Sequence, residues 1–269
     1  MTGLAQRFLE LHRGDTPLLM PNPWDPGSAV LFESLGFQAL ATTSSGFAAT
    51  LGRLDGQVTR DEAIAHAGAV AEAVSVPVSG DLENCFADDP DGVAETVRLA
   101  AEAGLAGCSV EDYSGPESDT IYEPGPAAER VAAAVEAARA APDGFVLTAR
   151  AENHVHGRDD LADTISRLQS FQEAGADVLF APGLRELSDI REVVSSVDLP
   201  VNVLVLPGMP SIPELAEAGV SRISVGGGFA YAALGAAAEA ARELQQSGTY
   251  GFWETAAGGA KAAREAFTD

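Results

Sequence analysis

Positive charge is scarce in this chain of 269 residues. It has 16 lysine and arginine residues against 40 aspartate and glutamate residues, which gives a formal net charge of −24 at pH 7. Such a charge argues against nucleic acid or an anionic membrane surface as a partner. It leaves an anionic substrate open, because a bound divalent cation reverses the charge locally.

Lysine, cysteine and long apolar runs are also rare. The only lysine, Lys261, follows the last predicted strand, so none is available for a Schiff base at a carbonyl carbon. Two cysteines, Cys85 and Cys108, form no metal-binding pair and favour free thiols in a reducing cytoplasm. No apolar run reaches 18 residues, and the first fifteen residues resemble an amphipathic helix more than a signal peptide. We therefore expect a cytoplasmic protein without a membrane span.

What the chain does contain is an alternation of short apolar runs with helical stretches rich in Ala, Glu and Arg. Alternating strands and helices predict parallel βαβ units, and eight of them at this length predict a closed (β/α)8 TIM-type barrel. Three Glu-Ala-Gly segments lead from a helix into a strand, as a glycine at a helix C-terminus does. The predicted strands are Leu18–Met20, Ala39–Thr43, Val76–Asp81, Cys108–Glu111, Phe145–Arg150, Val178–Ala181, Val201–Val205 and Arg222–Val225.

No linker long enough to separate two domains interrupts this alternation. We expect one domain over residues 1–269, with the barrel over about 17–246 and a helical extension over about 247–269. Within the extension, Tyr250–Phe267 could cover the barrel or dock on another subunit. Residues 114–126 form a polar connection that is long for a barrel, which is typical of a mobile lid.

Polar residues gather where the predicted strands end. Catalytic groups of such barrels lie at the carboxyl ends of strands, so these side chains should meet at one rim. Clustered carboxylates stay ionised together only if a cation or hydrogen-bond donors compensate them, and oxygen ligands with water suit Mg²⁺. In strand order, the rim residues are Ser44, Ser45, Gly46, Asp55, Asp81, Glu83, Glu111, Asp112, Arg150, Glu152, Asn153 and Asn202.

The pattern of these residues predicts a substrate with acidic groups. Arg150 could clamp a carboxylate with two parallel hydrogen bonds. Ser44, Ser45 and the Gly46 amide could hold a second carboxylate, a carbonyl oxygen or a phosphonate. The residues thus favour a metal-chelated 2-oxo acid whose enolate is stabilised by Mg²⁺.

Each rim residue also has a purely structural interpretation. Asp55 could shape an Asp-Gly turn, and Asp81 could cap a helix. Glu83 and Glu111 could be solvated loop charges, and Arg150 could be an ion-pair partner within the barrel. Their placement at successive strand ends favours the functional interpretation.

Three other groups of residues could form a site. His154 and His156 form a His-x-His pair, but no third soft ligand for zinc accompanies them. Gly226–Gly228 could bind a phosphate or form a close turn. Cys85 could be a nucleophile or an acid, but a packing role is favoured because nothing indicates a lowered pKa of its thiol.

Several motifs resemble, in chain order, those of the isocitrate lyase/phosphoenolpyruvate mutase superfamily. The resemblance runs from about Pro21 to Gly228 and so covers nearly the whole predicted barrel. The motifs that carry it are PNPWD (Pro21–Asp25), TTSSGFAATLGRLDG (Thr42–Gly56), SGDLEN (Ser79–Asn84), SVEDY (Ser109–Tyr113), TARAEN (Thr148–Asn153), GADVLFAPG (Gly175–Gly183) and PVNVLV (Pro200–Val205).

The resemblance implies a divalent metal, Mg²⁺ or Mn²⁺, held directly by Asp81. Asp55, Glu83 and Glu111 would hold its water ligands. Members of the superfamily are commonly tetramers whose terminal helix is exchanged between subunits. Tyr250–Phe267 would be that helix here, so we expect a dimer or tetramer.

The resemblance also implies the substrate-binding residues. Ser45 and Gly46 would bind the oxo acid, Arg150 its carboxylate, and Asn202 the opposite side of the substrate. Trp24 belongs to the motif at the end of the first strand and is expected in the substrate pocket with Ser44 and Asp81.

The predicted lid departs from the superfamily. Its lyases carry a Lys-Lys-Cys-Gly-His loop whose cysteine is the acid/base, and its phosphonomutases carry a gating loop with lysine and asparagine. Residues 114–126 contain no cysteine, lysine, histidine or asparagine. We expect Tyr122 and Glu123 to act as acid/base beside Arg150 and Glu111, with Tyr113 a weaker choice.

The sequence therefore predicts a Mg²⁺-dependent lyase for a small carboxylate substrate. It would cleave a C–C bond of a 2-oxo acid or a 2-hydroxy di- or tricarboxylate, by retro-aldol or decarboxylation chemistry through a metal-stabilised enolate. One alternative is a phosphonomutase or phosphonopyruvate hydrolase that acts on a P–C bond. Another is a barrel that binds an oxo acid without turnover.

Overall fold

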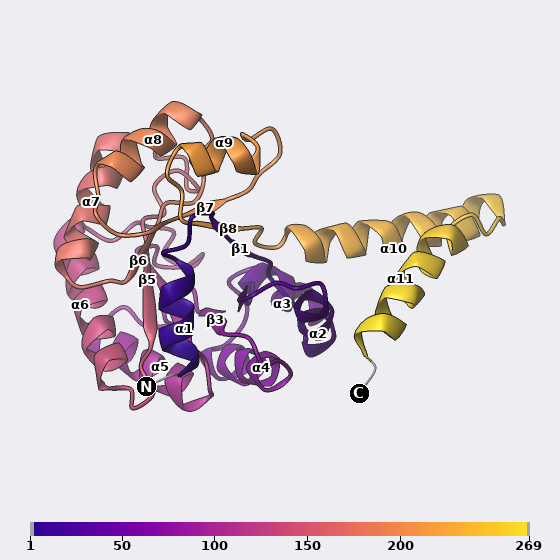
Figure 1. Ribbon diagram of the computed structural model, residues 1–269, viewed down its shortest axis with the longest axis horizontal. Helices are drawn as coiled ribbons and strands as arrows, with labels where there is room; N and C mark the ends of the chain where they lie inside the picture. The colour runs from indigo at the N-terminus through magenta and orange to yellow at the C-terminus, as the bar shows by residue number, and fades with distance from the viewer. Residues whose placement is uncertain (1–2, 268–269) are drawn as a thin grey trace.

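The computed structural model describes residues 3–267 and shows a barrel of eight parallel strands surrounded by helices (Figure 1). The hydrogen-bonded order is β1-β8-β7-β6-β5-β4-β3-β2, and the Ala41 amide donates to the Pro21 carbonyl (3.2 Å) where β2 meets the end of β1. The predicted fold class is confirmed. The strands are β1 (Leu18–Met20), β2 (Leu40–Ala41), β3 (Val78–Asp81), β4 (Gly107–Glu111), β5 (Val146–Arg150), β6 (Val178–Phe180), β7 (Val201–Leu204) and β8 (Arg222–Ser224).

Helices follow the strands, and several begin at residues that the sequence marks as caps. The Asp25 carboxylate accepts from the Ser28 amide at the start of α2, and Thr59 and Glu62 cap α4 reciprocally. The helices are α1 (Leu4–Leu11), α2 (Pro26–Ser34), α3 (Ser44–Thr50), α4 (Arg60–Glu72), α5 (Pro90–Glu102), α6 (Pro124–Ala140), α7 (Leu161–Glu173), α8 (Leu187–Ser195), α9 (Ile212–Glu217), α10 (Gly228–Ser247) and α11 (Trp253–Ala266).

Two segments differ from the sequence-based expectation. The Ser-Ser-Gly segment after β2 is the first turn of the short helix α3, with Thr43 as its N-cap. The long connection after β4 ends at Glu123, because α6 begins at Pro124 with proline in its first turn. An isolated bridge between Tyr113 and Ile121 closes this connection into a compact loop.

The apolar core lies between the strands and the surrounding helices. Leu40, Leu147 and Leu179 are fully buried there, and each such side chain contributes about 2 kcal/mol of transfer free energy. At the amino ends of the strands, Phe8 of α1 packs into a second cluster with Leu18 of β1. This leaves the carboxyl ends of the strands as the rim on which polar groups can gather.

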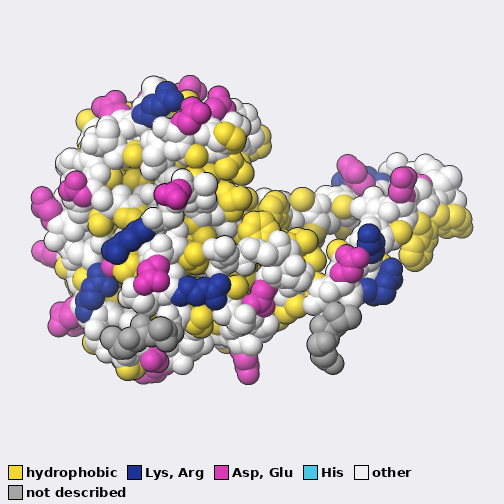
Figure 2. All heavy atoms as spheres, viewed as in Figure 1, with side chains coloured by type: hydrophobic (Ala, Val, Ile, Leu, Met, Phe, Trp, Pro, Cys, Tyr) yellow, Lys and Arg dark blue, Asp and Glu magenta, His cyan; other side chains and the backbone are white. Residues whose placement is uncertain are grey.

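The two C-terminal helices extend away from the barrel, and α11 turns back toward α2 (Figure 1). Ala230 is the only buried residue described in α10, and α11 has none. Large apolar side chains such as Leu234, Leu244 and Trp253 are half or more exposed on this arm, where Figure 2 shows apolar surface. Within residues 3–267, no helix is long and apolar enough to cross a membrane.

Candidate functional site

Arg150, the last residue of β5, is the centre of the rim. Its Nη1 lies 2.8 Å from Asp81 Oδ1, its Nη2 lies 3.1 Å from Glu111 Oε2, and its Nε lies 2.8 Å from Glu152 Oε1. The three carboxylates come from the end of β3, the end of β4 and the residue two positions after β5. The structure thus brings together side chains that the sequence placed at separate strand ends.

Asp81 is fixed by hydrogen bonds of both its carboxylate and its backbone amide. Its Oδ2 accepts from the Ser44 amide (2.9 Å), and its own amide donates to Thr42 Oγ1 (2.8 Å). Because α3 starts at Ser44, its first amide faces this carboxylate, and the partial positive charge of a helix N-terminus favours an anion there. These contacts hold the carboxylate in place at the rim.

Burial and neighbouring negative charges raise the pKa values of three further rim carboxylates, Glu83, Asp55 and Glu111. Burial, followed by repulsion from Asp81 and Asp55, raises the pKa of Glu83 to about 8. Partial loss of water and the charge of Asp81 raise the pKa of Asp55. Burial also raises the pKa of Glu111, although Arg150 opposes the shift. A cation bound among these groups would let all of them ionise.

The oxygen donors of the rim fit a hard cation that keeps most of its water. No three carboxylate, imidazole or thiol groups within residues 3–267 are placed to hold one ion together. Mg²⁺ needs fewer protein ligands, since it usually retains several waters and binds one or two carboxylates. Asp81 as a direct ligand, with Asp55, Glu83 and Glu111 bound to its waters, matches that chemistry.

The loop after β3 carries unusual backbone conformations. Glu83, Cys85 and Phe86 have φ angles of 51°, 59° and 55°, in the left-handed region that favours glycine. Such conformations persist only where the surrounding structure imposes them, and they cluster at functional sites. Cys85 itself is fully buried beside Cys108, which agrees with a packing role for its thiol.

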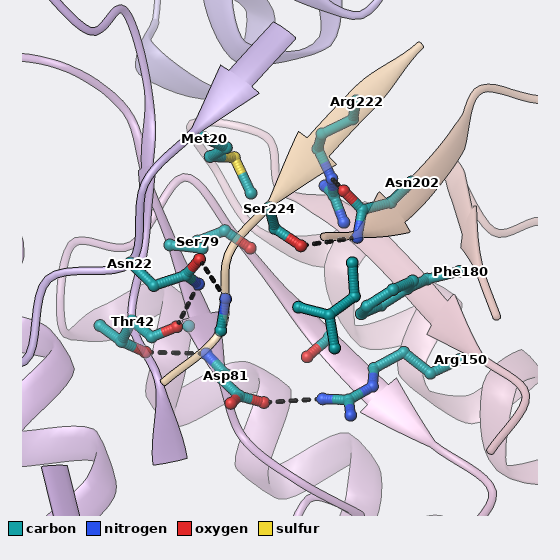
Figure 3. Close-up of a pocket in the computed structure, with 15 residues that line it drawn as sticks. Met20, Asn22, Thr42, Ser79, Asp81, Arg150, Phe180, Asn202, Arg222 and Ser224 are labelled. Carbon is teal, nitrogen blue, oxygen red and sulfur yellow. Dashed lines mark hydrogen bonds and ion pairs between the residues drawn. The ribbon is translucent and has the colours of Figure 1, made fainter. Parts of the chain in front are cut away.

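A cavity of about 90 Å³ opens between Arg150 and the strands across the barrel (Figure 3). Asn22 joins its walls, because its Oδ1 accepts from the Val225 and Gly226 amides (both 2.9 Å) and its Nδ2 donates to the Thr42 carbonyl. Asn202, expected to contact substrate, lines this cavity and donates from Nδ2 to Ser224 Oγ (3.0 Å). Asp81 and Arg150 face the same space.

Other predicted binding residues lie around this cavity but do not line it. The Trp24 ring packs against Phe32 of α2 at 6.1 Å between centroids. Ser45, on α3, has its Oγ 3.2 Å from Oγ1 of Thr43, the N-cap of that helix. A Cβ at Gly46 would come within 2.5 Å of Thr43 Cγ2, so close packing alone requires glycine there.

The expected acid/base groups Tyr122 and Glu123 lie farther out. The Tyr122 hydroxyl donates to Asp88, and the Arg130 guanidinium lies 4.2 Å over the Tyr122 ring. Glu123 is exposed directly before α6. Neither side chain has a contact with Asp81 or Arg150 among the described residues.

A different pair lies at the rim beside Arg150. The Tyr113 ring stacks on His156 at 3.6 Å between centroids, and His156 Nε2 is 4.0 Å from Glu152 Oε2. The sequence had pointed to Tyr113 as a weaker acid/base and to His156 only as part of a His-x-His pair. The sequence placed Glu152 at the rim without a specific role and did not single out Arg222, although an arginine within a predicted barrel strand is a signal for a buried charge.

Comparisons with known proteins identify the family of the chain. A family model described as phosphoenolpyruvate phosphomutase matches residues 8–245. Oxaloacetate decarboxylase 2 of Pseudomonas fluorescens (strain Pf0-1) is 31% identical over 258 residues, covering 92% of this chain and 86% of that protein.

Two solved structures from Burkholderia cenocepacia J2315 are also similar. A candidate lyase/mutase is 48% identical with a TM-score of 0.94 and covers 98% of this chain and 95% of its own. A candidate phosphonomutase is 36% identical with a TM-score of 0.82, and the match covers 90% of this chain and 99% of that chain.

Proposed function

The chain belongs to the phosphoenolpyruvate phosphomutase family, whose members are lyases and mutases, and from this we propose that it is a Mg²⁺-dependent carbon–carbon lyase. Its substrate would be a small 2-oxo acid or a 2-hydroxy di- or tricarboxylate. The observation that carries the proposal is the single guanidinium of Arg150 between Asp81, Glu111 and Glu152 at the rim of the barrel.

The acidic rim residues would hold the metal, Mg²⁺ or Mn²⁺. Asp81 would bind it directly, and Asp55, Glu83 and Glu111 would bind its waters. When bound, it would supply Lewis-acid stabilisation of the negative charge that develops on the oxo oxygen of the substrate.

Arg150 would orient the substrate through its carboxylate. The fork of its guanidinium matches a carboxylate bidentately, and Glu152 at Nε keeps that fork in place. A substrate carboxylate would take over Nη1 or Nη2, which Asp81 and Glu111 now contact. Phe180, whose ring lies 5.2 Å from Arg150 Cζ, supports the guanidinium from one face.

In decarboxylation of a 2-oxo acid, the electron pair of the broken C–C bond stays on the oxo-acid fragment as an enolate, which then receives a proton. In retro-aldol cleavage of a 2-hydroxy acid, the hydroxyl proton leaves to a base as the oxo acid forms, and the electron pair goes to the other fragment, which receives the proton. Tyr122 and Glu123 remain the proposed donors, with Ser44, Ser45, Gly46, Trp24 and Asn202 as the proposed surroundings of the substrate. Since Tyr122 and Glu123 do not contact Arg150, the loop over residues 114–123 would have to bring one of them inward.

A substrate screen tests the proposed reaction. Purified protein would be mixed with a panel of 2-oxo and 2-hydroxy acids, and release of a 2-oxo acid fragment would be followed with Mg²⁺ and with EDTA. We expect turnover that requires the metal and that falls by at least a hundredfold in Arg150→Gln. Full turnover in EDTA would contradict the proposal, and ligand binding without any turnover would favour the non-catalytic alternative.

A second candidate function is cleavage or rearrangement of a P–C bond. It is favoured by the match to a phosphomutase family model and by the likeness to a candidate phosphonomutase. Phosphorus NMR on phosphonopyruvate separates the two functions. New phosphate or phosphoenolpyruvate signals would support this alternative, whereas an unchanged spectrum would leave the carbon–carbon lyase.

A further inference from the structure

A second buried arginine faces the cavity from the side opposite the rim. Arg222, the first residue of β8, is 3% exposed, and its side chain reaches toward Asn202 in Figure 3. Its Nε donates to Asn202 Oδ1 (2.9 Å), and its Nη1 lies 3.1 Å from Thr148 Oγ1 and 3.3 Å from His12 Nε2. None of these partners is a carboxylate.

His12 does not supply a countercharge or add a second cation. Burial and the charge of Arg222 lower the pKa of His12 to about 3, so its ring is neutral at physiological pH. His12 Nδ1 lies 2.8 Å from the Phe8 carbonyl, so a proton on Nδ1 leaves the Nε2 lone pair to accept from Arg222. The imidazole therefore holds the guanidinium in position as a neutral acceptor.

The two arginines of the cavity differ in charge balance. Arg150 has three carboxylates around it, whereas Arg222 has no ion pair within residues 3–267. Burial and repulsion from Arg150 lower the pKa of Arg222 to about 9, which still leaves it charged at neutral pH. A buried charge without a partner is costly, and an anion in the adjacent space would compensate it.

The cavity gives an anion access to Arg222. Barrel interiors are ordinarily filled by bulky branched side chains. Here four small residues line the cavity together with the larger Met20, Phe180 and Leu204; the small residues are Ala41, Ser79, Ser109 and Ser224. A guanidinium has five N–H donors, and the contacts of Arg222 use one on Nε and two on Nη1. Both hydrogens of Nη2 lack an acceptor in the described part of the chain.

We propose that Arg222, with Ser224 beside it, forms an anion subsite that takes a second carboxylate of the substrate. The substrate class is then a dicarboxylic 2-oxo or 2-hydroxy acid that spans from Arg150 to Arg222. This inference rests on the proposed function, because it requires that Arg150 and the metal bind the first carboxylate of the substrate.

Calorimetric titration with two matched ligands tests the subsite. Malate and 2-hydroxybutyrate have the same chain length and differ in the second carboxylate, and oxalate probes the rim alone. With Mg²⁺ present, we expect malate to bind the wild type at least tenfold more tightly than 2-hydroxybutyrate. In Arg222→Gln the two affinities should converge while oxalate affinity stays the same, and Arg222→Lys should recover part of the preference.

Control experiments distinguish failure of the Arg222 subsite from failure of the proposed function. Arg139→Gln, which removes an exposed arginine on α6, should leave the malate preference unchanged. Equal affinities for malate and 2-hydroxybutyrate in the wild type would overturn the subsite without any variant, as would a preference that persists in a folded Arg222→Gln protein. Absence of oxalate binding with Mg²⁺ would instead overturn the proposed function.

Discussion

Arg150 forms ion pairs with carboxylates from three strand ends, and all four side chains are largely buried. Removing one partner of a buried ion pair leaves the other charge uncompensated, which typically costs about 3–5 kcal/mol. We therefore expect Arg150→Gln to lower the free energy of unfolding by about that amount in EDTA, as measured by urea denaturation. Mg²⁺ should restore part of the loss, because it binds the folded state.

Arg98→Gln is the matched control for this change. Arg98 pairs with Glu95 and Glu102 on the exposed face of α5, where solvent screens the charges. Its replacement should leave the urea midpoint almost unchanged. Equal effects of the two substitutions would mean that the Arg150 cluster is no more desolvated than a surface pair.

His12 predicts how stability depends on pH. Its pKa is about 3 in the folded protein against an ordinary 6.5, so between these values the unfolded chain binds a proton that the folded protein does not. Stability should therefore fall as pH falls below 6.5, with a slope of up to about 1.4 kcal/mol per pH unit from this group. Urea unfolding of the wild type and His12→Gln at pH 7, 6 and 5 would measure it. The variant should have the shallower acid slope, and identical slopes would contradict the assignment.

At the scale of elements, the loop over residues 114–123 matters most. Its ends are joined by the bridge between Tyr113 and Ile121 and by a 2.9 Å contact between Ser114 Oγ and Thr120 Oγ1. If this loop supplies the proton, Tyr122→Phe or Glu123→Gln should lower kcat by about a hundredfold or more, with oxalate affinity unchanged.

The control for the loop is Asp119→Asn, which keeps an acceptor for the Tyr113 hydroxyl. It should leave kcat near the wild-type value in the same steady-state assay. If neither Tyr122→Phe nor Glu123→Gln slows turnover, the proton comes from another group.

The same elements show how far the sequence predicts the structure. All eight strands begin and end within two residues of their predicted bounds. Short apolar runs that follow a helix-ending glycine leave few other positions for a strand. The convergence of Asp81, Glu111 and Arg150 follows from parallel strands whose carboxyl ends share one rim.

What the sequence did not reveal depends on contacts between distant segments. The neutral partners of Arg222 are His12 at the end of α1, Thr148 of β5 and Asn202 of β7. No local sequence pattern predicts contacts between residues so far apart in the chain. Helix α3 was missed because Ser-Ser-Gly has low helix propensity, and the helix exists through its Thr43 cap and its packing against the barrel. The position of the Tyr122 hydroxyl depends on Asp88, a residue of another loop.

On the scale of the whole molecule, the arm formed by α10 and α11 extends from the barrel with little of its apolar surface buried. Its apolar side chains are exposed over two helices, and patches of this kind mark protein–protein interfaces (Figure 2). We propose that the arm binds another copy of the chain, as the sequence resemblance implied for Tyr250–Phe267. Light scattering after size exclusion should give a dimer or tetramer.

Substitutions on the arm sharpen that prediction. Leu234→Glu combined with Trp253→Glu should shift the protein to a smaller species, because charge is costly in an apolar interface. Leu4→Glu, on the exposed side of α1, should leave the assembly unchanged. A wild-type monomer at micromolar concentration would contradict the proposed role of the arm.

The central claim is a metal-dependent site for an oxo acid at the rim, and calorimetric binding of oxalate tests it most directly. Oxalate resembles the enolate form of a 2-oxo acid, and it would be titrated into wild type and Asp81→Ala, with Mg²⁺ and with EDTA. Asp61→Ala, on the exposed side of α4, is the control. The account predicts binding that requires both Mg²⁺ and Asp81 and that Asp61→Ala retains. No binding to folded wild type with Mg²⁺, or equal binding to Asp81→Ala, would contradict it.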